Sequence, residues 1–168
     1  PTIRSEPRIN DSILFEDRID VDAYEAYELV HPAYARQILA LAGALHPLTA
    51  PRTRVLDIGT GPGLPLEMLL QLIPDLQVTA LDPSETAFRH LTRRFADPPG
   101  VRCFRCGIDA FEHTGESFDA AISVGASHHL DTALFFRSTA KNLKEGATFI
   151  VSDEMISPFR TVEERKIN

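Results

Sequence analysis

The spacing of apolar residues differs between the first and later parts of this chain, and it predicts two kinds of structure. Between Pro32 and Leu45 the residues Tyr34, Ile38, Leu41 and Leu45 recur every three to four positions, which predicts a helix with one buried face. Two prolines in the stretch HPLTAPR end that pattern. From residue 54 onwards, short apolar runs alternate with helical stretches.

That alternation predicts five strands separated by turns and helices. Strands are expected at 54–59, 77–82, 101–107, 118–125 and 147–154. Helices are expected at 64–73, from Glu85 to about Phe95, and from Asp131 to about Lys144. Pro65 is tolerated in a first helical turn, Ser84 and Asp131 can act as N-caps, and Gly146 is expected to stop the last helix.

The strands barely alternate between apolar and polar residues, which is typical of a parallel sheet covered on both faces. Strands separated by helices favour right-handed crossover units. The fold class predicted is therefore α/β, a doubly wound and mostly parallel sheet with helices on both faces. A ligand should lie outside the carboxyl ends of the strands, where the strand order reverses.

The segment VLDIGTGPG (55–63) carries the most specific chemistry. It runs from a strand into Gly59, Gly61 and Gly63, and glycine lets a ligand approach the backbone closely. A dinucleotide fingerprint would need glycine where Leu64 stands, and a P-loop would need Gly-Lys-Ser/Thr. A tight turn without a ligand is the alternative for an isolated glycine loop. Asp82, about nineteen residues further on, can accept hydrogen bonds from both hydroxyls of a ribose, or simply precede a helix.

These residues resemble the class I (Rossmann-like) S-adenosylmethionine-dependent methyltransferases of the small-molecule type. Asp57 followed by the GxGxG loop is similar to the first motif of that family, and Asp82 to its second. GIDAF (107–111), FDAAISVGASHHL (118–130) and LKEGATFIVSDE (143–154) are similar to later motifs, so the resemblance covers about 52–154. It implies the strand order 3-2-1-4-5 and an S-adenosyl-L-methionine cofactor, with Asp109 at the adenine amino group and Ala110 or Phe111 near the ring.

The cofactor-binding residues expected on these grounds are Asp57, Gly59, Thr60, Gly61, Gly63, Asp82, Pro83, Asp109, Ala110 and Gly125. Family members usually continue through a further antiparallel hairpin, which this sequence is expected to lack. We favour missing sequence over a genuine five-stranded sheet. The expected division is an N-terminal helical lid over 1–50 and a cofactor-binding domain over 51–168, with truncation at the C-terminus.

His128 and His129 are candidates for a catalytic base, because they follow the fourth strand and histidine titrates near neutrality. Packing against the cofactor is the alternative for either. Asp153 and Glu154 could bind a substrate cation or cap the next helix. Tyr24 and Tyr27 are expected to share one helix face, as part of a substrate-side lid or in ordinary packing.

The composition of the chain limits the kinds of partner that it is expected to bind. The chain has 168 residues, 17 basic and 24 acidic, a formal net charge of −7 and a pI near 5.3. Acidity disfavours broad nucleic-acid binding. No run is apolar for long enough to cross a membrane, and the N-terminus lacks the apolar core of a signal peptide. The arginines that cluster in sequence should form a solvated face: Arg89, Arg93, Arg94, Arg102 and Arg105.

The two cysteines, Cys103 and Cys106, should point to opposite faces of a strand as buried, inert thiols. No metal site is expected, and a reducing, cytoplasmic location follows from the cysteine usage. The open edge of TFIVS (148–152) favours pairing with another chain, so a homodimer is one expectation.

We therefore expect methyl transfer from S-adenosylmethionine to a small molecule, with no nucleic-acid or membrane partner. A non-catalytic S-adenosylmethionine sensor or pseudoenzyme subunit is the first alternative. A nucleotide-cofactor oxidoreductase is the second, although Leu64 and the GIDAF element disfavour it. Methyl transfer is an in-line displacement that depends mainly on alignment and exclusion of water, and a base is needed only when the acceptor must lose a proton.

Overall fold

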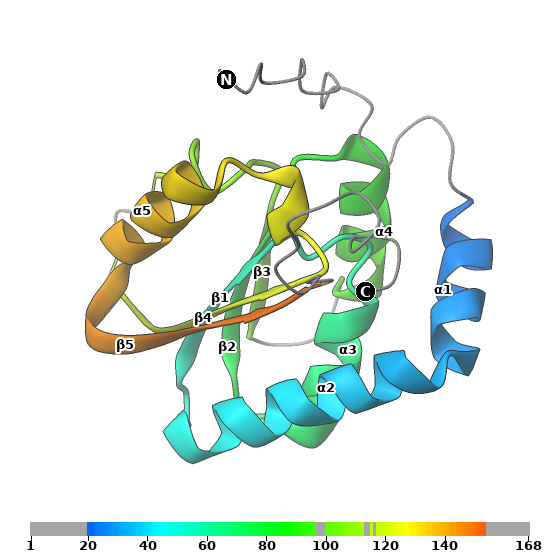
Figure 1. Cartoon of the computed structure of the whole chain (residues 1–168), viewed down its shortest axis with the longest axis horizontal. Helices are drawn as coiled ribbons and strands as arrows, with labels where there is room; N and C mark the ends of the chain where they lie inside the picture. Colours follow the sequence, from blue (N-terminus) through cyan, green and yellow to red (C-terminus); the bar gives the residue numbers. More distant parts are fainter. Residues whose placement is uncertain (1–19, 97–99, 113–114, 116, 154–168) are drawn as a thin grey trace, which may run out of the picture.

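The computed structural model describes residues 20–96, 100–112, 115 and 117–153. Glu154 and the first part of the N-terminal segment lie outside these residues. Five parallel strands form one sheet in the order β3-β2-β1-β4-β5 (Figure 1), which confirms the expected fold class and strand order. The strands are β1 (Arg54–Ile58), β2 (Gln77–Leu81), β3 (Val101–Phe104), β4 (Phe118–Val124) and β5 (Leu143–Ser152).

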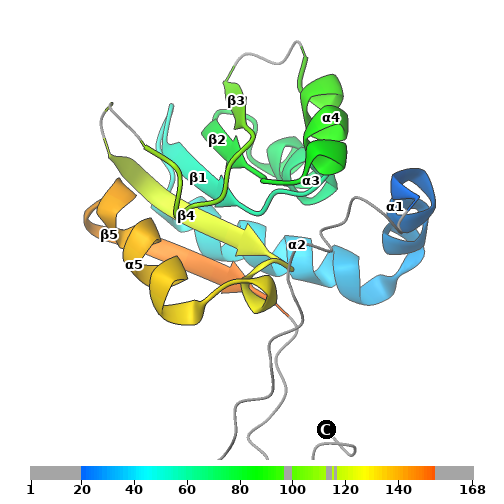
Figure 2. The same ribbon diagram turned by 90° about the horizontal axis from the view of Figure 1, so that it is seen from above.

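Helices cover the two faces of the sheet unequally (Figure 2). α2 (Pro32–Leu45), α3 (Leu64–Leu72) and α4 (Glu85–Arg94) pack on one face, and α5 (Thr132–Asn142) lies beside β4 and β5 on the other. α1 (Val21–Val30) packs on α2 away from the sheet. No helix in the described part of the chain is long and apolar enough to cross a membrane.

Two apolar clusters hold the layers together. The larger one joins α2, α3 and α4 to the sheet, and Leu45, Val55 and Leu69 in it are fully buried. The smaller one joins α5 to the opposite face through Phe135 and Phe118. Complete burial of each such side chain stabilises the fold by about 1.5–3 kcal/mol. The hydrophobic spacing that predicted α2 therefore corresponds to a real interface.

Side-chain caps fix where three helices begin. Ser84 Oγ accepts a hydrogen bond from Ala87 N at 3.1 Å, and Asp131 Oδ1 accepts one from Leu134 N at 2.9 Å, as expected from the sequence. Asp20 caps α1 in the same way. α5 ends at Asn142, two residues before the expected end near Lys144, but the expected stop at Gly146 is wrong, because Gly146 lies inside β5 with φ of 77°.

The expectation that all strands are buried on both faces is wrong for β3. This strand lies at an edge of the sheet, and its residues alternate between half-buried and exposed. Because β3 ends at Phe104, Cys106 lies beyond the strand rather than in it. Cys103 and Cys106 are both free and only half-buried. Burial still raises the pKa of each thiol, which keeps them protonated and weakly nucleophilic.

Candidate functional site

The candidate site lies where the carboxyl ends of the parallel strands meet loops. The strand order reverses on either side of β1, so the ends of β1, β2 and β4 form the crevice in which open α/β sheets bind ligands. The glycine loop follows β1, Asp82 follows β2, Gly125 follows β4 and Asp153 follows β5. The sheet thus brings together residues that are far apart in sequence.

The glycine loop and Asp82 contact each other directly. Gly61 N donates a hydrogen bond to Asp82 Oδ2 at 2.8 Å, and Ser84 N donates to Asp82 Oδ1 at 2.9 Å. Gly59 N and Thr60 N both donate to Leu81 O, at 2.9 and 3.0 Å. These two amides hold the Asp82 side chain in one orientation.

The three glycines of the loop face different surroundings. All have positive φ, of 70°, 61° and 95° in chain order. A Cβ on Gly59 would lie 2.3 Å from Ala126 Cβ, and one on Gly63 would lie 2.8 Å from the side chains of Leu91 and Phe95. A Cβ on Gly61 would meet no atom within 4 Å. Gly59 and Gly63 therefore serve close packing, and Gly61 borders open space at the carboxyl edge.

Asp57 is a buried carboxyl group at the end of β1, only 3% exposed. Burial raises its pKa to about 7, a hydrogen bond with Thr60 opposes this rise, and the charge of Asp82 adds to it. A positive charge placed nearby would stabilise the ionised form. Asp57 and Asp82 together give the crevice a negative potential that suits a cationic ligand and disfavours a pyrophosphate.

The residues that follow β3 lie in two environments, one exposed and one in the core. Asp109 and Ala110 are exposed, and Ala110 N donates to Gly107 O at 3.2 Å in a turn. Phe111 instead packs in the smaller cluster, with its ring centroid 5.5 Å from that of Phe104. Of the two residues expected near an adenine ring, Ala110 is the more accessible.

The remaining predicted cofactor residues also lie at this edge. Gly125 directly follows β4 with φ of 66°, and a Cβ there would meet no atom within 4 Å. Its amide donates to Ser152 O at 2.8 Å, which ties β4 to β5. Pro83 is exposed beside Asp82, and Thr60 is buried under the loop.

His128 forms a pair with Asp153, a contact that the sequence did not predict. The two lie 25 positions apart, and His128 Nδ1 is 2.7 Å from Asp153 Oδ1. The Asp153 side chain is 2% exposed and also accepts hydrogen bonds from Ser127 Oγ and His128 N. His128 itself is 46% exposed. The sequence suggested a substrate cation or a helix cap for Asp153, and neither alternative includes contact with His128. The contact depends on the pairing of β4 with β5, which the sequence does not show.

His129 is exposed and packs against His128, with ring centroids 4.0 Å apart. Its amide donates to Ala126 O at 3.1 Å in the short turn after β4. In the described residues no group of three or more histidine, cysteine, aspartate or glutamate side chains is arranged to hold a metal ion.

Tyr24 and Tyr27, the two tyrosines expected in a lid, differ in environment. Tyr24 is half-buried, whereas Tyr27 is 60% exposed and lies 5.6 Å, centroid to centroid, from the ring of His31. Both tyrosines lie in α1, three positions apart, as the shared helix face requires, but Tyr27 is the more exposed of the two. α1 is attached through Glu25, which forms a 2.6 Å ion pair with Arg94 of α4. Tyr34 is buried beneath α1, and burial, with nearby Tyr24 and acidic side chains, raises its pKa.

The arginines expected to form one solvated face are divided among three environments. Arg94 is half-buried between Glu25 and Glu67. Arg105 pairs with Glu85 in solvent at 3.0 Å. Arg102 lies at a different place, on the sheet face near the amino ends of the strands. Sequence proximity grouped these side chains, but the strand and helix directions separate them.

Comparison with known proteins identifies the class. Residues 55–146 match the methyltransferase domain family, and the chain belongs to that family. With its parallel sheet and glycine loop, it is a class I S-adenosylmethionine-dependent methyltransferase domain, as the sequence motifs predicted.

One related sequence is the tRNA1(Val) (adenine(37)-N6)-methyltransferase of Flavobacterium psychrophilum, 33% identical over 86 residues. The match covers 49% of this chain and 37% of that protein. The chain thus spans little more than a third of this relative.

Two solved structures share the fold. DesVI of Streptomyces venezuelae has a TM-score of 0.66 at 23% identity, covering 83% of this chain and 59% of that one. Phosphoethanolamine N-methyltransferase 2 of Haemonchus contortus, in complex with phosphomonomethylethanolamine and S-adenosylhomocysteine, has a TM-score of 0.66 at 24% identity, with coverage of 79% and 31%. At these identities the likeness concerns the fold alone.

Proposed function

We propose that the protein transfers a methyl group from S-adenosylmethionine to a small-molecule acceptor and releases S-adenosylhomocysteine. The observation that carries this proposal is the contact between the Gly61 amide and Asp82, beside a space that no side chain fills. Glycine at this position lets a ligand approach the backbone without meeting a Cβ. The family match supports the same activity.

The residues at the carboxyl edge fit this cofactor chemically. Bound there, S-adenosylmethionine supplies an electrophilic methyl group on a positively charged sulfur. Asp82 offers acceptors for two ribose hydroxyls, Asp57 offers negative charge for a cation, and Asp109 offers an acceptor for an amino group. The rest of the cradle is Gly59, Thr60, Gly61, Gly63, Pro83, Ala110 and Gly125.

His128 is the better candidate of the two histidines for moving a proton. An ionised carboxylate only accepts hydrogen bonds, so Asp153 favours the tautomer of neutral His128 with the proton on Nδ1. Nε2 then keeps its lone pair. It can take a proton from an acceptor hydroxyl or amine while the buried Asp153 stabilises the imidazolium that results. His129 is then assigned the alternative role, packing against His128.

A small acceptor is favoured by the charge of the chain and by the site. The chain carries −7, and acidic side chains line the carboxyl edge, so a polyanion would be repelled there. The Haemonchus structure contains phosphomonomethylethanolamine, whereas the Flavobacterium relative is named as a tRNA methyltransferase, so the test below includes both acceptor classes. Tyr24 and Tyr27 on α1 are the proposed lid on the substrate side, attached through Glu25 and Arg94.

Binding and turnover together test the proposal. Thermal melting with S-adenosylmethionine, S-adenosylhomocysteine and NAD should show a shift with the first two alone. A specific ligand at a hundredfold excess over Kd stabilises by about 2.7 kcal/mol. A shift with NAD alone would refute the assignment.

Turnover is then measured as S-adenosylhomocysteine formed with separate panels of small phenols, amines, thiols and carboxylic acids, and with tRNA transcripts. We expect product with one small-molecule class. Product with tRNA only would overturn the acceptor class. Cofactor binding without product on any panel would favour the sensor alternative.

A further inference from the structure

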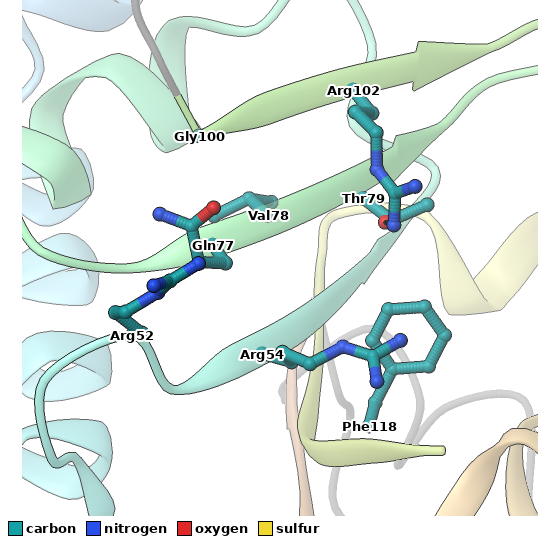
Figure 3. A pocket seen from close by; sticks show the side chains of 8 residues that line it. All are labelled: Arg52, Arg54, Gln77, Val78, Thr79, Gly100, Arg102 and Phe118. Carbon is teal, nitrogen blue, oxygen red and sulfur yellow. Dashed lines mark hydrogen bonds between the residues drawn. The ribbon is translucent and has the colours of Figure 1, made fainter. Parts of the chain in front are cut away.

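A second cavity lies at the opposite end of the sheet from the cofactor residues. Its volume is about 540 Å³, within the range of small-ligand sites. Figure 3 shows the side chains that line it over the amino ends of β1, β2 and β3. We call it the arginine groove. Its principal lining residues are Arg52, Arg54, Gln77, Thr79, Arg102 and Phe118.

The groove exists because one sheet face is incompletely covered. α5 lies beside β4 and β5 and leaves the face of β2 and β3 open in the described part of the chain (Figures 1 and 2). On that face Arg54 pairs in register with Gln77, and Thr79 pairs with Arg102. On the opposite face of the same strands stand Val55, Val78 and Val101, beneath the helices.

The side chains on this open face are polar, whereas a helix packed over it would need apolar partners. Burying guanidinium groups under a helix without counter-charges would be costly. Among the described residues, neither Arg52 nor Arg102 pairs with a carboxylate, although the chain as a whole is strongly acidic. In the described part of the chain, Asp119 is an acidic group near Arg54: it accepts a hydrogen bond from Arg54 N at 2.8 Å and pairs with Lys144. Against the effect of burial, its pKa is lowered by these two hydrogen bonds and by the charges of Lys144 and Arg54.

The groove also has fixed components. The Arg54 guanidinium lies 5.2 Å from the ring centroid of Phe118, a ring that is 1% exposed and anchored in the core. Thr79 is 2% exposed, and its hydroxyl is within 3.5 Å of Arg102 Nη2. Arg54 is therefore held against a buried ring, which lowers the entropy lost when its side chain binds a ligand, whereas Arg102 is exposed.

Arg52 occupies a backbone position that normally takes glycine or asparagine. Thr53 N donates to Ala50 O at 3.0 Å, which closes a four-residue turn around Pro51 and Arg52. Arg52 has φ of 68°, the one positive value among non-glycine residues in the described chain. Proline followed by a positive φ is the pattern of a type II turn, in which glycine is the usual third residue. An arginine held there against its backbone preference suggests a functional use of its charge.

We propose that the arginine groove binds a small, multiply charged organic anion of the phosphate or pyrophosphate class. Guanidinium groups donate paired hydrogen bonds that match phosphate oxygens, and three of them converge on one cavity together with an amide and a hydroxyl. A groove of this volume accommodates a ligand of nucleotide size. The site is separate from the cofactor residues, and its existence does not depend on the methyl-transfer activity.

Calorimetric titration of the full chain with inorganic phosphate, pyrophosphate and ADP tests this proposal, at low salt and with saturating S-adenosylhomocysteine present. We expect one site with affinity rising from phosphate to pyrophosphate. The double variant Arg54→Gln/Arg102→Gln should weaken pyrophosphate binding at least tenfold. The charge-matched control, Arg89→Gln/Arg93→Gln on α4, should change it less than twofold, and S-adenosylhomocysteine binding should be unchanged in both.

A second variant covers the case in which loss of Arg54 impairs folding. Arg52→Asn removes one charge from an exposed turn while keeping a residue that tolerates positive φ. It should not lower the melting temperature and should weaken pyrophosphate binding by about threefold or more. No heat or shift with any of the three anions would overturn the proposal, and so would equal affinity in the wild type and the arginine variants. Tight binding of a single-stranded RNA 15-mer without binding of pyrophosphate would overturn it in favour of a nucleic-acid surface.

Discussion

The carboxyl ends and the amino ends of the same parallel strands carry opposite charges. Asp57 and Asp82 stand at the ends of β1 and β2, whereas Arg52, Arg54 and Arg102 gather where β1 and β3 begin. β1 has five residues, which corresponds to a length of about 17 Å. This length separates the two groups of charges along the sheet. One sheet can therefore present a site for a cation and a site for an anion.

The comparison predicts that substitutions at the carboxyl edge change cofactor binding or turnover and leave pyrophosphate binding unaltered. The largest expected effect concerns the pair of His128 and Asp153. His128→Gln should lower kcat by about 10²–10⁴-fold on an acceptor that must lose a proton, because the base is lost. The Kd for S-adenosylhomocysteine should stay within twofold.

Asp153→Asn distinguishes positioning from packing at the same pair. The amide can donate to Nδ1 and so favours the other tautomer, which places the proton on Nε2. We expect a large loss of kcat, an altered pH–rate profile and an unchanged KM. His129→Gln is the matched control, with cofactor affinity intact and only a small change in kcat. Full kcat in His128→Gln would remove the acid–base role.

The next largest effect separates the glycines of the loop. Gly59→Ala should destabilise the fold by about 2–5 kcal/mol, since the new Cβ overlaps Ala126 and the backbone has positive φ. Gly61→Ala should cost about 1–2 kcal/mol from its φ alone, yet should weaken cofactor binding more than any other loop substitution that still folds. Gly43→Ala in α2 meets no atom within 4 Å and should not destabilise. Urea melts and titrations measure both quantities.

A somewhat smaller effect is expected at Asp82. Asp82→Ala should raise the cofactor Kd by about 10–100-fold, because two hydroxyls and the amides of Gly61 and Ser84 lose a charged acceptor. Asp75→Ala, an exposed carboxylate in a turn, is the control. Pyrophosphate affinity should be the same in both variants. An unchanged cofactor Kd in Asp82→Ala would remove this residue from the site.

The smallest effect is a pH dependence from Asp57. Its pKa is about 7 when folded, against 3.8 for the free side chain, so the folded protein binds more protons than the unfolded chain between these values. The contribution of Asp57 to stability therefore falls as pH rises from about 4 to about 7 and then levels off. A cationic ligand favours the ionised carboxylate, so S-adenosylmethionine should bind more tightly as pH rises, by up to about tenfold per unit below 7.

Calorimetry between pH 5.5 and 8 measures this dependence. Asp57→Asn should abolish it, and neutral 5′-methylthioadenosine should not show it in the wild type. Equal affinity for S-adenosylmethionine at both pH limits would contradict the charge interaction. Pyrophosphate binding in the arginine groove should show no dependence on Asp57.

Local sequence was sufficient for the fold and for half of the site. The strand–helix alternation, the caps at Ser84 and Asp131, and the glycine loop depend on neighbouring residues, and the structure places them as predicted. The direct contact between Asp82 and Gly61 was not predicted, although the adjacency of β1 and β2 explains it. Such features depend on spacing along the chain or on one strand pairing.

The other features depend on longer-range geometry. The His128–Asp153 contact requires the β4–β5 register, and the arginine groove requires three strands and the position of α5. Two signals were present but not used: the alternation of β3, and an arginine after Pro51 where a turn favours glycine. The early end of α5 was missed because Gly146 suggested a stop that tertiary pairing of β5 overrides.

A hydrogen bond links α2 to the last strand. Gln37 Nε2 donates it to Ser152 Oγ at 2.9 Å. Ser152 is the immediate neighbour of Asp153 and also receives the amide of Gly125. A fragment trimmed to the family's own limits, 55–146, would lose both partners of this link along with the carboxylate that orients His128. Expression designs for this protein should therefore retain α2, even though the conserved family region begins after it.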